Sequence, residues 1–287
     1  MQDKKVWLIT GAGRGLGSFI AKAVMAAGDQ VVATGRNPEK VKQTLGEHAD
    51  LLVVKLDITN AEDAVWAVQA AQERFGRIDV LVNNAAGFHA GFFEELSMED
   101  LEQELATNLI GPMKVTRAVL PLMRQQGSGQ IISISSTAGL VGFPFNSAYC
   151  LSKFGLEGWM EALQGEIEPF GLQTMTVNPG FFRTELLSDE STNYASSVIN
   201  DYTDRREQNS QFYKDKHGKQ EGDPAKLAQA LIELSALPKL PRRFIAGIDA
   251  ISITEKQVAD RQQEMAAYRD LSMSLDFDTD PLSKVIS

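Results

Sequence analysis

The stretch KVWLITGAGRGLG, residues 5–17, joins an apolar run to a glycine-rich segment. The run KVWLIT has the nearly continuous apolar character of a strand that helices cover on both faces. Glycines at a turn from strand to helix let the backbone adopt positive φ and approach a ligand, and the start of a helix presents free N–H groups to phosphate. The stretch therefore predicts a strand, a turn and a helix that bind a dinucleotide.

Strand-like and helix-like patterns alternate along the rest of the chain. Apolar runs recur as QVVATG, LLVVKL, IDVLVNN, QIISIS, LQTMTVN and RRFIAG, with longer helical patterns between them. Such alternation implies parallel strand pairing with right-handed crossovers. We therefore expect one α/β domain over residues 1–287, with a doubly wound parallel sheet of about seven strands and helices on both faces.

Two segments depart from this alternation. From about residue 184 to 223 the composition is polar with few apolar residues, which predicts an inserted helical lid. Beyond the last strand pattern a further helical pattern and a polar tail predict a C-terminal helical extension over about 251–287, mobile at its end.

Composition and charge exclude several classes of protein. The chain has 43% hydrophobic and 23% charged residues, which suits a globular domain with a large core. A net charge of −10 argues against a general nucleic-acid binder, which would present a basic face. No apolar run approaches the roughly 18 residues of a membrane span, and the N-terminus has no signal-peptide pattern. We expect a cytoplasmic protein.

Cysteine and histidine give no support for a metal site. The single cysteine, Cys150, excludes an internal disulfide and a thiolate-rich metal cluster. The three histidines, His48, His89 and His217, are scattered without metal-ligand spacing. We expect His89 to be an exposed loop residue, although contact with substrate is an alternative.

The glycine segment has the spacing T-G-x-x-x-G-x-G. Gly11, Gly15 and Gly17 occupy its fixed positions, and Leu16 stands where the dinucleotide fingerprint G-x-G-x-x-G has its third glycine. A glycine-rich turn can also be purely structural. Its place between the first predicted strand and helix favours binding of a nucleotide.

Two arginines indicate which nucleotide is bound. The second strand pattern ends with Gly35 and Arg36, and no acidic residue precedes Glu39. An acid there would accept the ribose 2′-hydroxyl of NAD, whereas an arginine suits a 2′-phosphate. Arg14, inside the glycine segment, is a second cation for that phosphate. Either arginine alone is equally a solvated surface charge, but the pair favours NADP(H) over NAD(H).

A tyrosine and a lysine stand four residues apart in AYCLSKFG, residues 148–155. On a helix this spacing puts Tyr149 and Lys153 on one face, with Cβ atoms about 5–6 Å apart. Ser136 stands directly after the strand pattern QIISIS, at the sheet edge where ligands bind in such folds. Ser136 could hydrogen-bond a substrate carbonyl oxygen while Tyr149 protonates it and hydride arrives from the nicotinamide. Since an ammonium about 4 Å away favours phenolate by up to about 4 kcal/mol, we expect Lys153 to lower the pKa of Tyr149.

Three motifs together resemble those of the short-chain dehydrogenase/reductase family, over about residues 5–250. TGAGRGLG is similar to the family's glycine motif, NNAAG (83–87) to its N-N-A-G with one extra alanine, and YCLSK to its Y-x-x-x-K. The resemblance implies a Rossmann-like fold with Asn108, Ser136, Tyr149 and Lys153 as the catalytic group. In the family the asparagine supports a water that relays protons to the lysine. Ser135 is the neighbouring alternative to Ser136, whose spacing to the tyrosine fits the family.

The resemblance also implies contacts with the cofactor. Asp57 and Ile58 would lie at the adenine, Asn84 and Lys153 at ribose, and Pro179, Gly180 and Thr184 near the nicotinamide. The segment PRRFIAGIDA and the added helix resemble the longer, hydroxysteroid- or retinol-dehydrogenase-like or carbonyl-reductase-like members.

The expected substrate pocket is largely apolar. An apolar lining favours a bulky apolar ketone, aldehyde or alcohol, although each of these residues taken singly is equally a core or oligomer contact. The residues expected around it, besides His89, are Phe88, Phe92, Phe93, Val141, Phe143, Phe145, Phe181, Phe182 and Leu186.

We therefore expect an NADP-dependent carbonyl reductase, reversible as an alcohol dehydrogenase, that acts on a small molecule as a homodimer or homotetramer. One alternative is a 3-oxoacyl-carrier-protein-type ketoreductase, which would need basic residues around its pocket. Another is a catalytically silent NADP(H)-sensing regulator, which would be expected to lack the tyrosine or the lysine.

Overall fold

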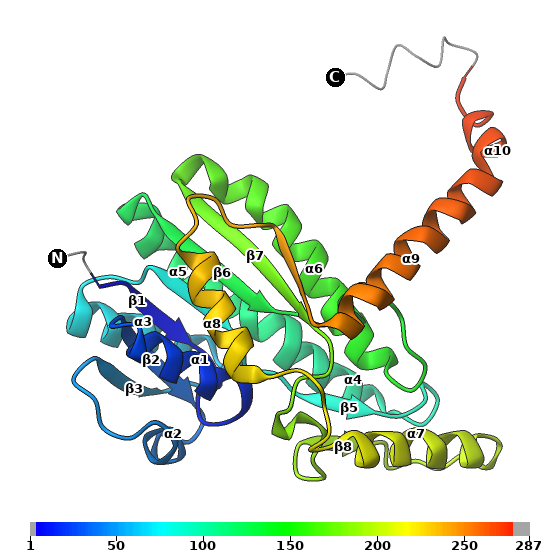
Figure 1. The fold of residues 1–287 in the computed structure, drawn as a ribbon, viewed down its shortest axis with the longest axis horizontal. Coiled ribbons are helices and arrows are strands. Elements are labelled where there is room, and N and C mark those ends of the chain that lie inside the picture. The colour runs from blue at the N-terminus through cyan, green and yellow to red at the C-terminus, as the bar shows by residue number, and fades with distance from the viewer. Residues whose placement is uncertain (1–3, 278–287) are drawn as a thin grey trace.

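Seven parallel strands form the central sheet in the computed structural model, which describes residues 4–277 (Figure 1). Their order is β3-β2-β1-β4-β6-β7-β9, and all neighbouring pairs are parallel. The predicted doubly wound sheet is confirmed. The strands are β1 (Val6–Ile9), β2 (Gln30–Gly35), β3 (Leu51–Lys55), β4 (Val80–Asn83), β6 (Gly129–Ile134), β7 (Leu172–Pro179) and β9 (Arg243–Ala246).

Helices connect and cover these strands. Several of them begin at a side chain that accepts a hydrogen bond from a free N–H group of the first turn, which is why they start where they do. Such caps are Asn37 for α2, Asn60 for α3, Ser97 for α4 and Asp223 for α8. The helices are α1 (Gly15–Ala26), α2 (Pro38–Leu45), α3 (Ala61–Phe75), α4 (Met98–Leu105), α5 (Gly111–Gln126), α6 (Ser147–Ile167), α7 (Thr203–Lys216), α8 (Pro224–Ser235), α9 (Ile248–Ala267) and α10 (Arg269–Met273).

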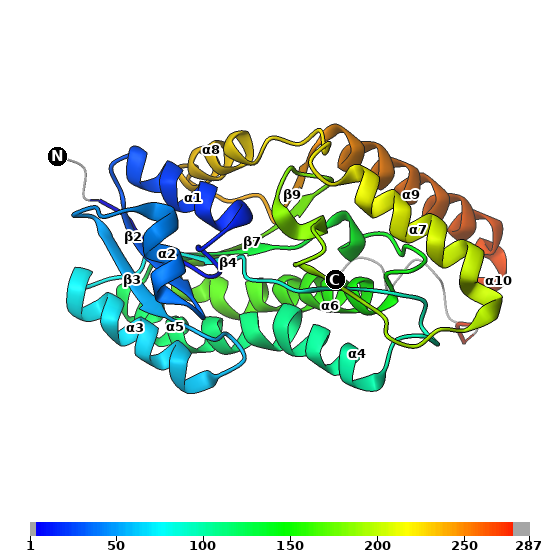
Figure 2. The same cartoon turned by 90° about the horizontal axis from the view of Figure 1, so that it is seen from below.

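Helices lie on both faces of the sheet (Figure 2), and alternate residues of the strands pack against these two layers. Val6 and Leu8 of β1 lie in a cluster with residues of α3, α5 and α6, whereas Trp7 and Ile9 lie in a second cluster with residues of α1, α2 and α8. Burying one large apolar side chain contributes about 1.5–3 kcal/mol. Because both faces are covered, the strands are apolar along nearly their whole length.

The direction of winding reverses between β1 and β4. The chain proceeds outward from β1 to β2 and β3, and then returns to β4 on the other side of β1. Ligands in open α/β sheets bind at the carboxyl ends of the strands beside such a reversal. Here those ends lead into the glycine segment after β1 and into NNAAG, which begins at Asn83, the last residue of β4, so the fold brings these two motifs together.

The polar segment 184–223 lies beyond the carboxyl ends of the strands, with α7 along the lower edge of Figure 1. It contains the expected helix and also a short strand, β8 (Thr192–Tyr194), which pairs in parallel with β5 (Phe88–Ala90). This small sheet was not indicated by the sequence pattern. It attaches the segment to the loop that follows β4.

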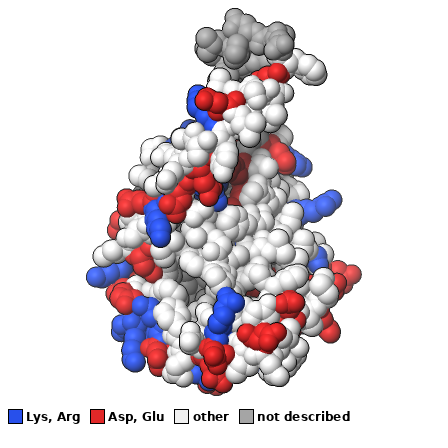
Figure 3. Space-filling model, turned by 90° about the vertical axis from the view of Figure 1, so that its right-hand side faces the viewer, with Lys and Arg blue, Asp and Glu red and all other residues white. Residues whose placement is uncertain are grey.

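The C-terminal helix α9 projects from the body of the molecule and leads to α10 (Figure 1). Within α9 only Ala250 is buried. On the side from which it projects, the middle of the surface carries few charged side chains, and those present lie mainly around it (Figure 3). The polar end predicted to be mobile falls largely in residues 278–287, outside the described residues. None of the helices in residues 4–277 is long and apolar enough to cross a membrane.

Candidate active site

The glycine segment forms a close turn between β1 and α1. Gly11 and Gly15 have φ of 68° and 52°, which residues with a side chain rarely adopt. A Cβ on Gly17 would lie 2.5 Å from both the Gly11 carbonyl oxygen and Asn84 Nδ2. Among residues 4–277, no side chain caps α1, whose first residue follows Arg14. The free N–H groups of its first turn, Leu16 included, can therefore bind the phosphates of a dinucleotide.

The two arginines differ in their surroundings. Arg36 is exposed at the end of β2, and its positive charge acts on Asp57. Arg14 Nη1 donates a hydrogen bond of 2.9 Å to Ser191 Oγ, which belongs to the segment 184–223. Arg14 thus links the glycine turn to this segment, a contact that its place in the motif did not indicate.

The residues predicted at adenine and ribose are already engaged with the protein. Asp57 Oδ1 accepts hydrogen bonds from the backbone N and Oγ1 of Thr59, at 2.9 and 2.7 Å. Burial raises the pKa of Asp57, but the Thr59 hydrogen bonds and the charge of Arg36 outweigh it and lower that pKa. The Ile58 side chain is buried and lies against Gly111. Asn84 Nδ2 donates to Thr10 O at 2.8 Å and so joins the ends of β4 and β1.

Helix α6 positions both residues of the Y-x-x-x-K motif in the interior. Tyr149 is 8% exposed and Lys153 is 2% exposed. Lys153 Nζ donates a hydrogen bond of 2.9 Å to the backbone oxygen of Ile134, at the end of β6, and lies 5.5 Å from the centroid of the Tyr149 ring. The spacing along the helix thus places the two residues as predicted, with the ammonium aimed at the strand end.

The expected effect of Lys153 on the pKa of Tyr149 is wrong for this structure. Burial raises the pKa of the Tyr149 phenol, the charge of Glu104 raises it further, and the Ser136 side chain opposes the shift. Burial also lowers the pKa of Lys153 to about 8, against the charges of Glu104 and Glu157. Both groups lose water when buried, and this disfavours the ionised phenol of Tyr149 as well as the charged ammonium of Lys153.

Ser136 follows β6 and starts a short 3₁₀ turn. Its Oγ accepts a hydrogen bond of 3.1 Å from Ala138 N, and its backbone oxygen accepts one of 3.0 Å from Asn178 Nδ2. Of the two adjacent serines, it is Ser136 that acts on the pKa of Tyr149. Ser135 Oγ is buried without a hydrogen-bond partner among the described residues.

Asn108 lies in a π-helical turn, Ala106–Ile110, between α4 and α5. Such turns often occur at functional sites. Asn108 exchanges two hydrogen bonds with the Gly87 backbone, and its Nδ2 also lies within hydrogen-bond distance of Glu104 Oε1 at 2.7 Å and Ser152 Oγ at 3.2 Å. It therefore connects NNAAG to α6.

The expectation that His89 is exposed is wrong. His89 is a buried residue of β5, and its Nδ1 lies 2.6 Å from Oε2 of Glu104, whose side chain is fully buried. Sequence reasoning missed Glu104 altogether. Its one local signal is that it stands four residues before Asn108, on the same face of a helix.

The segment after β7 packs closely against the start of α9. A Cβ on Gly180 would lie 2.1 Å from Oδ1 of Asp249, whose Oδ2 accepts a hydrogen bond of 2.8 Å from Phe181 N. Pro179 ends β7, and Thr184 begins the segment 184–223, where its Oγ1 accepts from Leu186 N. Asp249 thus shapes the loop predicted to lie near the nicotinamide, a role that sequence spacing could not reveal.

Aromatic side chains cover Tyr149. The rings of Phe88 and Tyr149 meet edge to face at 5.1 Å, and Tyr213 of α7 meets Phe88 in the same manner at 5.6 Å. Tyr213 also exchanges hydrogen bonds with the side chain of Asn146, just before α6. Through Tyr213 the segment 184–223 therefore packs in the same cluster as Tyr149.

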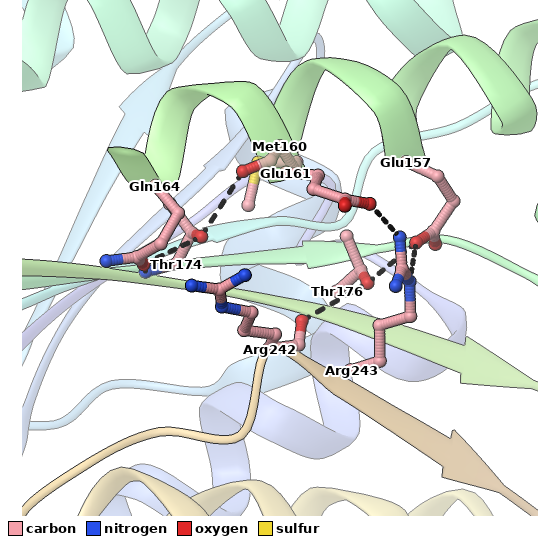
Figure 4. Close-up of a pocket in the computed structure, with 8 residues that line it drawn as sticks. All are labelled: Glu157, Met160, Glu161, Gln164, Thr174, Thr176, Arg242 and Arg243. Carbon is pink, nitrogen blue, oxygen red and sulfur yellow. Dashed lines mark hydrogen bonds and ion pairs between the residues drawn. The ribbon is translucent and has the colours of Figure 1, made fainter. Parts of the chain in front are cut away.

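Only some of the predicted pocket residues belong to this cover. Phe88, Phe92, Phe145, Phe143 and Phe181 share the cluster of Tyr149. Phe93 is 63% exposed, Leu186 is also exposed, and Phe182 packs with the sheet core. The cavity of Figure 4 is separate from the predicted site, since it is lined by Glu157, Met160, Glu161, Gln164, Thr174, Thr176, Arg242 and Arg243. Among residues 4–277 no cluster of potential metal ligands is present.

Comparisons with known proteins identify the family of the chain. The family model for the short chain dehydrogenase matches residues 5–195. Oxidoreductase BOA17 of Botryotinia fuckeliana is 32% identical over 94% of this chain and 98% of its own length. The 3-ketodihydrosphingosine reductase of Bacteroides thetaiotaomicron is 32% identical over 85% of this chain and 88% of its own.

A solved structure extends the likeness to the whole fold. The crystal structure of a short-chain dehydrogenase from Streptomyces avermitilis has a TM-score of 0.88 and 34% identity, and covers 96% of this chain and 100% of its own. The match of the family model over most of the chain, together with these relatives, shows that the protein is an oxidoreductase of the short-chain dehydrogenase family.

Proposed function

We propose that the protein transfers hydride between NADP(H) and a bulky apolar ketone or aldehyde, or the corresponding alcohol, with Tyr149 as the general acid and base. One observation carries the proposal. Tyr149 and Lys153, with Ser136 acting on the phenol, are buried together at the carboxyl edge of the sheet beneath aromatic side chains. The catalytic group would be Ser136, Tyr149, Lys153 and Asn108.

The residues at the switch point fit a dinucleotide. The backbone at Gly11 and Gly17 has no room for a side chain, and the start of α1 is free to hold phosphate. Arg14 and Arg36 supply cations for a 2′-phosphate, which is the reason to favour NADP(H). The proposed cofactor-binding set is Gly11, Arg14, Gly15, Leu16, Gly17, Arg36, Asp57, Ile58, Asn84, Tyr149, Lys153, Pro179, Gly180 and Thr184.

The raised pKa of Tyr149 keeps the phenol protonated but also makes it a weaker acid than a free tyrosine. The phenol stays protonated at neutral pH, so it can give its proton to a carbonyl oxygen during reduction. Ser136 would donate a hydrogen bond to the same oxygen and stabilise the negative charge that develops there. NADPH, when bound, supplies the hydride to the carbonyl carbon. Lys153, with its pKa near 8, can return a proton toward the tyrosine at near-neutral pH.

The cover over Tyr149 favours an apolar substrate. A molecule that reaches the phenol must displace or lie among Phe88, Phe145 and Tyr213. Since Tyr213 belongs to α7, we infer that the segment 184–223 moves when substrate enters. The relative named 3-ketodihydrosphingosine reductase supports a ketone with a long apolar chain.

A substrate screen tests the proposal. Absorbance of NADPH and of NADH is followed separately with long-chain ketones, ring ketones, aldehydes and 3-oxoacyl thioesters. We expect oxidation of NADPH with apolar ketones, and loss of about 100- to 10,000-fold in Tyr149→Phe, because the general acid is removed. That variant should still bind NADPH.

A matched variant, Tyr268→Phe, removes a phenol from an exposed position just after α9 without removing the proposed acid. It should keep most of its turnover. Full activity in Tyr149→Phe, or no NADPH oxidation with any carbonyl, would contradict the proposed function.

A further inference from the structure

A buried ion pair lies next to the proposed catalytic group and has no part in the chemistry described above. His89 Nδ1 and Glu104 Oε2 are 2.6 Å apart, with side chains 6% and 0% exposed. An unpaired charge at such a position would cost several kcal/mol. The pair is therefore a built feature of the site, joining β5 to α4.

Hydrogen bonds lead from this pair to the backbone of Tyr149. Glu104 Oε1 accepts from Asn108 Nδ2 at 2.7 Å, and the same amide lies 3.2 Å from Ser152 Oγ. Ser152 Oγ in turn donates to the Tyr149 backbone oxygen at 2.8 Å. His89 also directly follows Phe88, whose ring packs on Tyr149. The pair is thus connected to Tyr149 in two ways, through hydrogen bonds that lead to its backbone and through the Phe88 ring that packs on its side chain.

Glu104 also acts on the titrating groups through its charge. It raises the pKa of Tyr149 and that of Lys153, and within residues 4–277 no other carboxylate acts on both. The other groups facing Tyr149 are Ser136, Cys150 and Tyr213, and the other one facing Lys153 is Glu157. In a buried site such a charge is weakly screened.

His89 is the group that compensates this carboxylate. The hydrogen bond that His89 donates to Glu104 raises the pKa of His89, burial opposes the shift, and the charges of Glu104 and Asp100 and a hydrogen bond to Gln103 support it. A raised pKa favours the imidazolium, which is the counter-charge that a buried carboxylate needs.

We propose that His89 and Glu104 are positioning residues of this active site, and that the Glu104 carboxylate, held by His89 and Asn108, sets the electrostatic field in which Tyr149 and Lys153 exchange protons. This inference rests on the proposed function. A purely structural pair would only join β5 to α4, so that its loss would lower stability without changing how activity depends on pH.

Two near-isosteric variants separate these possibilities. Glu104→Gln keeps groups able to hydrogen-bond His89 and Asn108 but loses the charge. We expect the alkaline limb of its kcat–pH profile to move to lower pH by about one unit, as for loss of a nearby unit charge at an effective dielectric near 20. His89→Gln keeps the carboxylate and removes its counter-charge, so its alkaline limb should stay in place or move to higher pH.

The matched control is Glu102→Gln, which makes the same change of charge at an exposed position of α4. Its profile should coincide with that of the wild type. An unmoved limb in Glu104→Gln would overturn the inference, and so would a shift to lower pH in both Glu104→Gln and His89→Gln, since that would indicate loosened packing.

An NMR titration measures the effect of Glu104 on the pKa of Lys153 without requiring turnover. The side-chain Cε signal of Lys153, assigned through Lys153→Met, should titrate near pH 8 in the wild type and at lower pH in Glu104→Gln. An unchanged midpoint would reject the inference. Absence of carbonyl reduction in a wild type whose Lys153 midpoint responds to Glu104→Gln would instead reject the proposed function alone.

Discussion

The proposed nucleotide half and the proposed catalytic half of this site are built in different ways. Around β1 and β2 the site consists of backbone turns and of cations near the surface, with Arg14 and Arg36 both exposed. Around α6 it consists of buried titratable groups, with Lys153 at 2% and Glu104 at 0% exposure. The first half would bind through groups that water already solvates. In the second half, burial in the folded protein shifts the pKa values of Tyr149 and Lys153.

The largest expected effect concerns the two adjacent serines of the catalytic half. Ser136→Ala should reduce kcat about 100- to 1000-fold, because it removes a donor to the developing oxyanion. Ser135→Ala should leave kcat close to that of the wild type, since Ser135 Oγ has no hydrogen-bond partner among the described residues. Steady-state kinetics on both variants check this. Equal losses would mean that the hydroxyls support only the local backbone.

The pH dependence of stability tests the buried lysine. Burial lowers the pKa of Lys153 from 10.5 to about 8 in the folded state. Between these values the unfolded chain holds a proton that the folded protein has released, so stability rises with pH. At about 1.4 kcal/mol per pH unit, the wild type should gain up to about 3 kcal/mol relative to Lys153→Met between pH 8 and 10.5. Urea unfolding over this range measures the difference, and parallel stability curves would show that the amine is not buried as described.

Charge removal probes the nucleotide half. Arg36→Ala should weaken NADPH binding by about 1.5–3 kcal/mol, roughly ten- to 150-fold, because a charged hydrogen bond to the 2′-phosphate is lost. NADH binding should change little. Lys42→Ala, an exposed cation of α2 already paired with Glu39, is the control. Isothermal titration calorimetry measures the affinity for both nucleotides. Equal losses of affinity for NADPH and NADH would contradict the proposed preference for NADP(H).

Two glycines in helices separate close backbone packing from simple helix propensity. Gly17→Ala should destabilise the protein by about 1–3 kcal/mol, since its Cβ would overlap Gly11 O and Asn84 Nδ2. Gly158→Ala in α6, where a Cβ meets nothing within 4 Å, should stabilise it by about 0.5–1 kcal/mol. Thermal unfolding shows whether each variant is more or less stable than the wild type. If both substitutions were stabilising, the glycine turn would have room for a side chain.

The elements that could be predicted share a local cause. Each strand of the main sheet is marked by its own apolar run, and the positions of Tyr149 and Lys153 follow from helix geometry. The elements that could not be predicted depend on distant partners. The strand β8 forms because residues of the segment 184–223 meet β5, far away in the sequence. Residue type alone favours a place for Phe93 and Phe182 in the pocket. In the structure Phe93 is exposed and Phe182 packs with the sheet core.

By itself, the sequence determined the family, the doubly wound sheet and the motifs at its carboxyl edge, because those features are encoded in short runs whose periodicity and spacing are local properties. Tertiary structure alone decided that His89 and Glu104 are buried as a pair, that Asp249 packs on Gly180, and that the pKa of Tyr149 is raised. Burial, close packing and a shifted pKa all depend on which protein atoms replace water around a side chain. That replacement is made by residues brought together from β5, α4, α6 and α9 only when the chain has folded.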